Sequence, residues 1–581
     1  MAGMAETDGP SRNAWLPAFT LSILAFAASL IGLLFVIGDA VGDEEVTPPP
    51  RSDATPTPLP RLTYSGQPPP GVDLRELDPA AAGVTADVVF AEGTAQDGFA
   101  YRYFVPVASL GAGIDTLTHE QVSAIASGAL TWQDAGGIGQ TALLAGARGD
   151  VAALTRFTGS EPQQAFGSYD ELYAAMADPL SGIVALVPLE QVRFQATAIA
   201  VDGIDIVRGK GNPADWPFIE WLSVRGTTER GRQLADRLQT ELRAEVPQST
   251  TVVATGDILM SRCSLTAIEA SGDWGAALRG EMGDYLAAAD LTLGSLDGSI
   301  QDINPPFRCV AGTNLSSPPE VMEALTLAGF DIITVATNHI FDCGIEYCGD
   351  RAFLQTLTRL HEAGIKTVGG GVNLEEALAP VIVEVNGVRF GVLGFDDVAA
   401  MDFEATADAP GTAPLDDSYE EERLAGEPAF FRPASELSIE RFTERIRALK
   451  AQVDVVILQV QTGTEDTHDP SPRSIKALRA AAEAGADLIV GNQAHHVQAI
   501  EAHGGSFISY ALGNFIFDQR HTVEHEQGYV LEATFWGPKL VNVKMLPYRI
   551  IDQHRPTFVT GAERSKILGD VFEADISPET P

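Results

Sequence analysis

Acidic, amide and imidazole side chains follow a series of apolar stretches in residues 251–520, at positions where they could bind a divalent metal. The first stretch, 251–255, is rich in β-branched residues and ends at Gly256 and Asp257. This pattern predicts a buried strand that delivers a carboxylate to the carboxyl edge of a sheet, where open α/β sheets bind ligands. Taken alone, an Asp at this position is more often the N-cap of the next helix, and it is the later polar groups that favour a site.

Four further apolar stretches end in polar groups of the same kinds. In chain order these are Asp297, the pair Asn338 and His339, Glu465, and His495. If the stretches are parallel strands, their ends meet at one edge of a sheet. Asp, Asn and His together suit Mn, Fe or Zn. A single histidine after a strand is more often structural, and it is the repetition of the pattern that favours a site.

Such a site could perform metal-assisted hydrolysis. A bound cation lowers the pKa of a water molecule and polarises a phosphoryl or carbonyl oxygen. Asn338 would supply a neutral oxygen ligand, and the adjacent His339 would donate a proton to the leaving group. Asp342 follows three residues later, so Asp342 and Glu465 complete the candidate catalytic set with His339.

The length and charge of the chain limit the possible partners. A chain of 581 residues is too long for one core, and we expect two or three domains. The formal net charge of −41, from 38 basic and 79 acidic residues, argues against nucleic acid and anionic membrane surfaces as partners. Solubility or a saline habitat is the simplest explanation for this acidity.

The amino-terminal region predicts a membrane anchor. Residues 15–37 form an uncharged stretch of 23 residues, which is enough to cross a hydrocarbon core of ~30 Å as a helix. Arg12 precedes this stretch and acidic residues follow it, which places residues 1–14 in the cytoplasm and the bulk of the chain outside. A cleaved signal peptide is the alternative, but no clear A-x-A site is present. Residues 38–74 are rich in Pro and Thr and predict a semi-rigid linker.

Residues 75–247 predict a smaller α/β domain, with helices near 118–127, 169–176 and 228–244 and without a Cys or His cluster. The stretches 117–137 and 182–203 resemble the phosphate-type solute-binding proteins of ABC transporters. The resemblance rests on a turn formed by Gly128, Trp132, Asp134, Gly136 and Gly137. Solute capture and docking by a degenerate lobe are both open interpretations for this domain.

The motifs of residues 251 to about 520 resemble the CapA family of poly-γ-glutamate capsule biosynthesis proteins, whose fold is similar to that of calcineurin-like metallophosphoesterases. The matching runs are Gly256–Arg262, Ser295–Gly298, Asn338–Gly344, Ala409–Asp416, 484–491 and 511–519. The resemblance implies an α/β sandwich of the metallophosphoesterase type over 251–550, followed by a tail at 551–581. It also implies metal ligands at Asp257, Asp297, Asn338 and His495, with His339 as the general acid.

Four positions depart from the pattern of the family. Gln461 stands where the family has a histidine, and Gln493 replaces the first of two histidines, so that only His495 remains. Asp297 replaces a Glu and Ser295 an Asn. Because a neutral amide is a poorer ligand than an imidazole, we expect one metal ion or none in place of a two-metal centre. His496 would point away from His495 on a strand.

All four cysteines lie near the motifs. Outside the cytoplasm an even set indicates disulfides, which would pair Cys263 with Cys309 and Cys343 with Cys348 and hold the loops of the site. A zinc site made of four thiolates is the competing interpretation, but no C-x-x-C pair is present.

The predicted anchor and the CapA resemblance together indicate a membrane-anchored, extracytoplasmic protein, and the resemblance implies that it makes, releases or attaches an anionic polymer such as poly-γ-glutamate. A metal-dependent hydrolase would act on this polymer or on a phosphoester. The alternative is a non-catalytic assembly subunit with a degenerate metal site. Both functions imply other membrane subunits of a polymer synthesis complex as partners.

Overall fold

The structure is a computed structural model that describes residues 60–70, 72–131, 143–178, 181–310, 312, 314–415 and 436–577. Residues 62–581 form one unit, and each element below belongs to it. The predicted anchor at 15–37, most of the predicted linker and residues 132–137 of the predicted turn lie outside the described residues. Within the described ranges, no helix has both the length and the hydrophobicity needed to cross a bilayer.

A nine-stranded mixed sheet forms the first part of this unit, in the order β2-β1-β3-β11-β4-β8-β6-β7 with β9 beside β4. The strands are β1 (Leu62–Ser65), β2 (Leu77–Pro79), β3 (Val88–Glu92), β4 (Phe99–Ser109), β6 (Leu143–Ala147), β7 (Gln164–Phe166), β8 (Ile183–Pro188), β9 (Ala196–Ala198) and β11 (Ile219–Gly226). The helices are α2 (His119–Ala126), α3 (Val151–Thr158), α4 (Tyr169–Ala175) and α5 (Glu229–Leu242). The sheet therefore begins at Leu62, within the stretch predicted as linker.

Two further sheets follow. An eight-stranded sheet has the order β17-β16-β13-β12-β27-β28-β29, with β26 beside β12, and a six-stranded sheet has the order β19-β20-β22-β23-β25-β24. The first contains β12 (Ser249–Ile258), β13 (Leu291–Leu296), β16 (Ile332–Thr334), β17 (Lys366–Val368), β26 (Asn514–Ile516), β27 (Gln527–Trp536), β28 (Lys539–Ile551) and β29 (Arg555–Phe558). The second contains β19 (Val381–Val385), β20 (Val388–Asp396), β22 (Val455–Gln461), β23 (Leu488–Asn492), β24 (Ile500–His503) and β25 (Ser506–Ser509).

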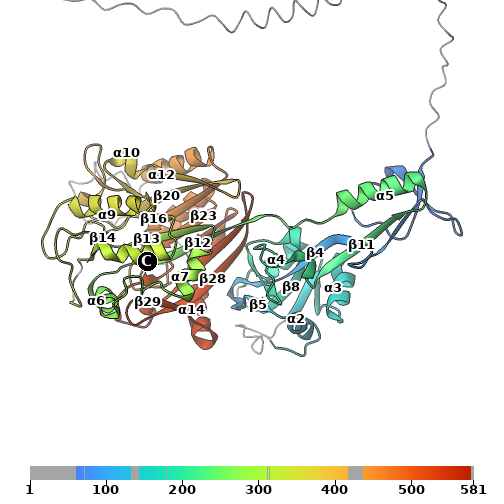
Figure 1. The fold of residues 1–581 in the computed structure, drawn as a ribbon, viewed down its shortest axis with the longest axis horizontal. Coiled ribbons are helices and arrows are strands. Elements are labelled where there is room, and N and C mark those ends of the chain that lie inside the picture. Colours follow the sequence, from blue (N-terminus) through green and yellow to red (C-terminus); the bar gives the residue numbers. More distant parts are fainter. Residues whose placement is uncertain are drawn as a thin grey trace, which may run out of the picture. The chain divides into compact units, whose positions relative to one another are not determined.

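These two sheets pack face to face, and helices cover their outer faces (Figure 1). Strand β12 shows why, because Val252 and Ala254 enter the core between the sheets while Val253 enters the core under the helices. The covering helices are α6 (Arg262–Ser271), α7 (Glu281–Ala287), α8 (Met322–Leu327) and α9 (Arg351–Glu362) on one side, and α12 (Glu436–Lys450) and α13 (Pro472–Glu483) on the other. The α/β class is confirmed, and the layers form an αββα sandwich.

The stretch predicted as a tail at 551–581 contains two elements. Strand β29 pairs with β28, and helix α14 (Gly561–Glu573) buries Ile567, Leu568 and Val571 against the core between the sheets. Only three buried side chains in 13 residues give a weak helical pattern, which explains why the sequence alone did not indicate this helix.

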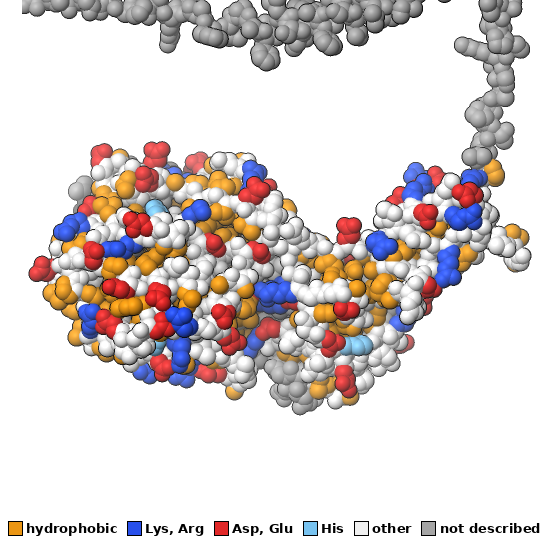
Figure 2. All heavy atoms as spheres, in the orientation of Figure 1, with side chains coloured by type: hydrophobic (Ala, Val, Ile, Leu, Met, Phe, Trp, Pro, Cys, Tyr) orange, Lys and Arg blue, Asp and Glu red, His pale blue; other side chains and the backbone are white. Residues whose placement is uncertain are grey.

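Acidic side chains are spread over the surface drawn in Figure 2, where basic and hydrophobic side chains lie between them. This distribution agrees with acidity that serves solubility.

A buried ion pair joins the first sheet region to the sandwich. Lys544 Nζ on β28 lies 2.7 Å from Asp205 Oδ2, and their side chains are 6% and 10% exposed. Burial alone would lower the pKa of Lys544, but the Asp205 carboxylate outweighs burial and raises it. Close by, Ala198 N on β9 donates to Asn542 Oδ1 over 2.8 Å.

We expect Lys544→Ala to lower the free energy of unfolding by about 3–5 kcal/mol, because it leaves the Asp205 carboxylate buried without its cation. Urea unfolding followed by circular dichroism measures the change. The double variant Lys544→Ala/Asp205→Ala should recover part of the loss, and equal losses in the single and double variants would contradict the ion-pair explanation.

Candidate metal centre

Asp257 lies near the end of β12, where the neighbouring strands place hydrogen-bond donors around it. Ser295 on β13 is its partner in the parallel register and donates from Oγ to Asp257 Oδ1 over 3.0 Å. The backbone N–H of Gln493, from the six-stranded sheet, donates to Oδ2 over 3.2 Å. Burial, and then the charge of Asp297, raises the pKa of Asp257 to about 7.

The hydrogen bond from Gln493 shows that the site spans two sheets. Asp257, Asp297 and Asn338 come from the carboxyl ends of β12, β13 and β16 in the eight-stranded sheet. Glu465 and the residues that follow β23 come from the six-stranded sheet. The prediction of a single sheet edge is therefore wrong, although the carboxyl ends of these parallel strands do converge.

Two residues hold buried oxygen atoms that lack partners. Both carboxylate oxygens of Asp297 and Oδ1 of Asn338 are inaccessible and have no hydrogen-bond partner among the residues that the structure describes. Burial is the largest cause that raises the pKa of Asp297. The His339 imidazolium opposes this rise, while the carboxylates of Asp342 and Glu465 add to it. Buried, unpartnered oxygen atoms beside a second buried carboxylate fit a divalent cation, which would neutralise the charge and accept these lone pairs.

His495 is held in one tautomer by a hydrogen bond to Asn514. Its Nδ1 lies 2.9 Å from Asn514 Oδ1, and the amide nitrogen of Asn514 donates to the backbone carbonyl of His525 over 3.0 Å. Because an amide oxygen only accepts, Nδ1 of His495 carries the proton and Nε2 keeps its lone pair. Metal-binding histidines are commonly held in this way. His495 Nδ1 is also 4.0 Å from Asp257 Oδ2.

His339 and Asp342 form a pair at the same place. His339 Nδ1 lies 2.8 Å from Asp342 Oδ2. Burial would lower the pKa of His339, but the charges of Asp297 and Asp342 outweigh burial and raise it to about 9. The direction of this shift favours the protonated imidazolium, which is the form that a proton donor requires.

Gln461 and Gln493 form a hydrogen-bonded chain with Glu465. Gln461 Nε2 donates to Gln493 Oε1 over 2.9 Å, and Gln493 Nε2 donates to Glu465 Oε1 over 3.1 Å. The backbone φ angles of Gln493 and His495 are 97° and 56°. Residues other than Gly rarely adopt positive φ angles of this size. Strained backbone of this kind is concentrated at functional sites.

Two asparagines that we did not predict as site residues also lie here. Both side-chain polar atoms of Asn492, at the end of β23, are buried without a hydrogen-bond partner in the described part of the chain. Asn514 orients His495, as described above. Its position in the run 511–519 that resembles the CapA family was the signal that could have identified it.

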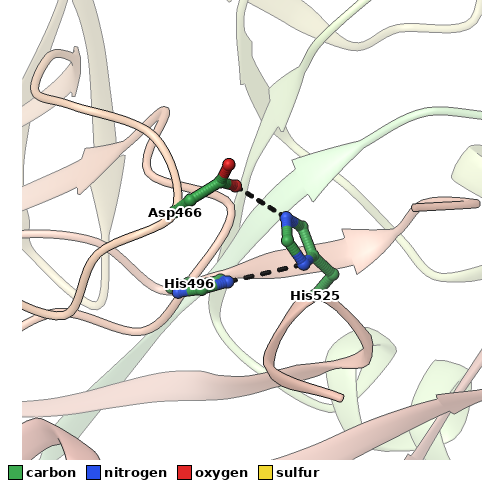
Figure 3. A group of neighbouring side chains, drawn as sticks. All are labelled: Asp466, His496 and His525. Atoms are coloured by element: carbon green, nitrogen blue, oxygen red, sulfur yellow. Dashed lines mark hydrogen bonds and ion pairs between the residues drawn. The ribbon is translucent and has the colours of Figure 1, made fainter. Parts of the chain in front are cut away.

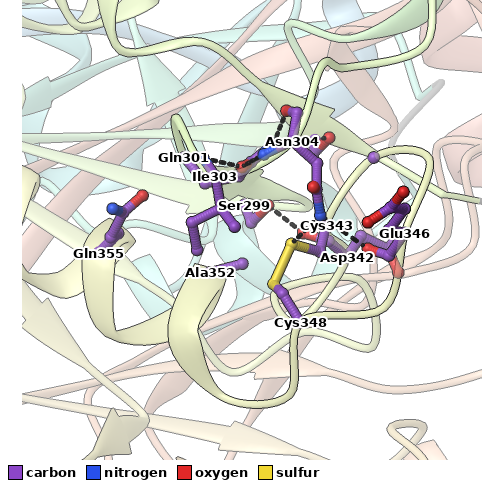
Figure 4. Close-up of a disulfide and its surroundings, with 12 residues drawn as sticks. Ser299, Gln301, Ile303, Asn304, Asp342, Cys343, Glu346, Cys348, Ala352 and Gln355 are labelled. Carbon is purple, nitrogen blue, oxygen red and sulfur yellow. Dashed lines mark hydrogen bonds between the residues drawn. A yellow bond between two sulfur atoms is a disulfide. The ribbon is translucent and has the colours of Figure 1, made fainter.

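Both predicted disulfides are present. Cys263 is bonded to Cys309 and Cys343 to Cys348, and the thiolate zinc site is therefore wrong. Figure 4 shows that Cys343–Cys348 closes a loop directly after Asp342. Asn304 Nδ2 supports this loop by donating to the backbone carbonyl of Glu346 over 2.9 Å.

The two disulfides should differ in their effect on stability. They close loops with sequence separations of 46 and 5 residues. From the entropy of loop closure we expect Cys263→Ser/Cys309→Ser to lower the free energy of unfolding by about 4 kcal/mol and Cys343→Ser/Cys348→Ser by about 2 kcal/mol. Guanidinium unfolding of the two double variants measures the difference. A larger loss for the shorter loop would show that native contacts, and not chain entropy, dominate.

Comparison with known proteins identifies the second part of the chain. Residues 251–519 match the family model of the bacterial capsule synthesis protein PGA_cap. Over these residues, a little under half of the chain, the protein is similar to the PGA_cap family. The predicted CapA resemblance is thus confirmed, and the candidate metal centre lies within the PGA_cap region.

One relative is the PGA biosynthesis protein CapA of Bacillus subtilis, which is 29% identical over 47% of this chain and 65% of its own length. Another is the capsule biosynthesis protein CapA of Bacillus anthracis, which is 27% identical over 47% of this chain and 61% of its own length. The chain therefore spans less than two thirds of the length of either relative. An ABC-type phosphate transport receptor from Vibrio cholerae aligns with 28% of this chain and 75% of its own at 15% identity. The TM-score of 0.24 is too low to establish a shared fold.

Proposed function

We propose that the PGA_cap region is a metal-dependent hydrolase of the metallophosphoesterase type that acts in the synthesis, release or attachment of a capsule polymer such as poly-γ-glutamate. The names of the CapA relatives support the pathway. One observation supports the chemistry: both carboxylate oxygens of Asp297, whose charge acts on Asp257, are buried and lack a hydrogen-bond partner in the described part of the chain.

Asp257, Asp297, Asn338 and His495 would hold one divalent cation of the Mn, Fe or Zn class. When bound, the cation supplies Lewis acidity that polarises a phosphoryl or acyl oxygen and activates water. His339 donates its proton to the leaving group, and Asp342 keeps His339 protonated and oriented. Glu465, held by Gln493, adds negative charge that stabilises the His339 imidazolium.

A second function is favoured by the glutamine chain. Gln461 and Gln493 use their amides on each other and on Glu465, so they offer no imidazole to a second cation. A PGA_cap region with one weak cation site, or none, would then be an assembly subunit of a polymer synthesis complex that works without catalysis.

The location of the protein is part of the proposal. An anchor at 15–37 would hold the folded region outside the cytoplasm, where a capsule polymer is exported and attached. The two disulfides support this location, because disulfides persist in oxidising compartments. Partners would be other membrane subunits of the complex and an anionic polymer, and not nucleic acid.

The test measures metal content and hydrolysis with the full-length protein loaded with Mn²⁺. We expect about one equivalent of Mn²⁺, together with cleavage of a phosphodiester or a γ-glutamyl substrate. The variant Asp257→Ala/His495→Ala should lose both the Mn²⁺ and the hydrolysis. Mn²⁺ binding without hydrolysis of either substrate class would favour the assembly function, and failure to bind Mn²⁺ or Zn²⁺ through these residues would exclude the hydrolase.

A further inference from the structure

A second group of ligand-type side chains surrounds His496 (Figure 3). One ligand atom each from Asp466, His496 and His525 lies within 4.8 Å of the other two. Asp466 is in the loop after β22, His496 follows β23, and His525 lies just before β27. The two histidines are buried, whereas Asp466 is exposed, so that solvent reaches one side of the group.

This group is separate from the candidate metal centre, although His495 and His496 are adjacent in sequence. His495 is bonded to Asn514 and lies near Asp257. The ring of His496 instead lies 4.6 Å from the ring of His525 and 5.1 Å from that of His468, measured between ring centroids. The side chains of His495 and His496 thus have different sets of neighbours.

The spacing of the two imidazoles fits a shared cation better than a hydrogen bond. His496 Nε2 and His525 Nδ1 are 3.4 Å apart. Ordinary hydrogen bonds from a nitrogen donor are about 2.7–3.2 Å long. In a tetrahedral zinc site with Zn–N bonds of about 2.0–2.1 Å, two ligand nitrogens are separated by about 3.3–3.4 Å.

Asp466 fixes the proton of His525 on the opposite nitrogen. Asp466 Oδ1 lies 2.7 Å from His525 Nε2, which donates to it (Figure 3). The Nδ1 lone pair of His525 then faces His496. A carboxylate that accepts from the second nitrogen of a histidine is the usual outer partner in zinc sites. Thr522 Oγ1 lies 3.1 Å from the same Nδ1 and in this tautomer donates its hydroxyl proton to it, so a cation at Nδ1 would take the place of this hydrogen bond.

His496 itself needs a partner. His496 is 6% exposed, and its Nδ1 atom is buried without a hydrogen-bond partner within the described ranges. The Nε2 atom of His496 makes only the long contact of 3.4 Å to His525 Nδ1 among the described residues. A bound cation would compensate a buried imidazole that has lost its water.

We propose that His496 Nε2 and His525 Nδ1 ligate a Zn²⁺ ion, with Asp466 as the carboxylate that orients His525 and with water completing the coordination. Imidazole ligands favour zinc over harder cations such as Mg²⁺ or Mn²⁺. The ion would tie together the loops after β22 and β23 and the segment before β27. The loops after β22 and β23 also carry Glu465 and His495.

The test titrates Zn²⁺ into the full-length protein by calorimetry. It uses the Asp297→Asn background, in which the candidate metal centre has lost a ligand, so the result does not depend on the proposed hydrolase. We expect about one equivalent of Zn²⁺ to bind in this background. Adding His525→Gln should abolish this binding, and adding Asp466→Asn should weaken it about 10–100-fold.

His503→Gln is the matched control, because His503 on β24 pairs with Glu483 at the surface and should leave Zn²⁺ binding unchanged. Unfolding in the presence of a chelator shows whether each variant folds. If His525→Gln does not fold, Asp466→Asn decides, since the Asp466 side chain is 62% exposed. Absence of Zn²⁺ binding in the Asp297→Asn background, or equal affinities with and without Asp466→Asn, would overturn the proposal.

Discussion

Asp297→Asn is expected to stabilise the metal-free protein while it destroys Mn²⁺ binding. Asp297 is fully buried, its two oxygens have no hydrogen-bond partner in the described part of the chain, and its charge and that of Asp257 act on each other. The amide removes one of these charges without changing the volume of the side chain. We expect a gain of about 1–3 kcal/mol in the free energy of unfolding with a chelator present.

The same substitution should weaken Mn²⁺ binding by more than about 100-fold. Loss of an outer partner already costs about 10–100-fold in metal affinity, and a direct ligand should cost more. Mn²⁺ at 100 times its dissociation constant would stabilise the wild type by about 2.7 kcal/mol and the variant by less than about 0.4 kcal/mol. Thermal unfolding with and without Mn²⁺ measures both effects.

Asp454→Asn is the control for this prediction. Asp454 is also a carboxylate next to a strand, but it accepts from Arg389 N over 2.8 Å, and this hydrogen bond is the main reason that its pKa is lowered. Its substitution should lower stability slightly and leave Mn²⁺ affinity intact. If Asp297→Asn also destabilised the metal-free protein, the buried carboxylate would be a structural group and the metal centre would be rejected.

Local sequence patterns predicted the parts of the site that depend on one strand each. Asp257 and Asp297 follow short apolar runs, so their positions at strand ends could be derived from the chain alone. The disulfides were also predictable from the sequence, because only four cysteines are present, all near the motifs, and they allow few pairings.

The division of the strands between two sheets could not be predicted in this way. β13 and β22 have the same apolar character, and nothing local determines that β13 pairs with β12 whereas β22 pairs with β20. These pairings are decided by the cores on both faces of each sheet. The group around His525 was missed for a related reason, because Asp466 and His525 are 59 positions apart.

The glutamine chain illustrates how a substitution changes a site without emptying it. An imidazole at position 461 or 493 could bind a cation, whereas the two amides satisfy each other and hold Glu465. The backbone N–H of Gln493 still donates to Asp257. In the proposed hydrolase this backbone donor would support the ligand Asp257, whereas the two amides offer no imidazole to a second cation.

His339→Gln should separate catalysis from metal binding. A positioned general acid contributes about 10²–10⁴-fold to a rate, so kcat should fall by this factor while Mn²⁺ content stays at the level of the wild type. Asp342→Asn should have a smaller effect in the same direction, because His339 loses the carboxylate 2.8 Å from its Nδ1 but keeps its position beside Asp297.

His361→Gln is the matched control, since this exposed histidine on α9 contacts Thr367 Oγ1 and should leave kcat unchanged. If His339→Gln retained full activity with bound Mn²⁺, the proton donor would have to be another group. If it lost Mn²⁺ as well, His339 would be a ligand in place of an acid.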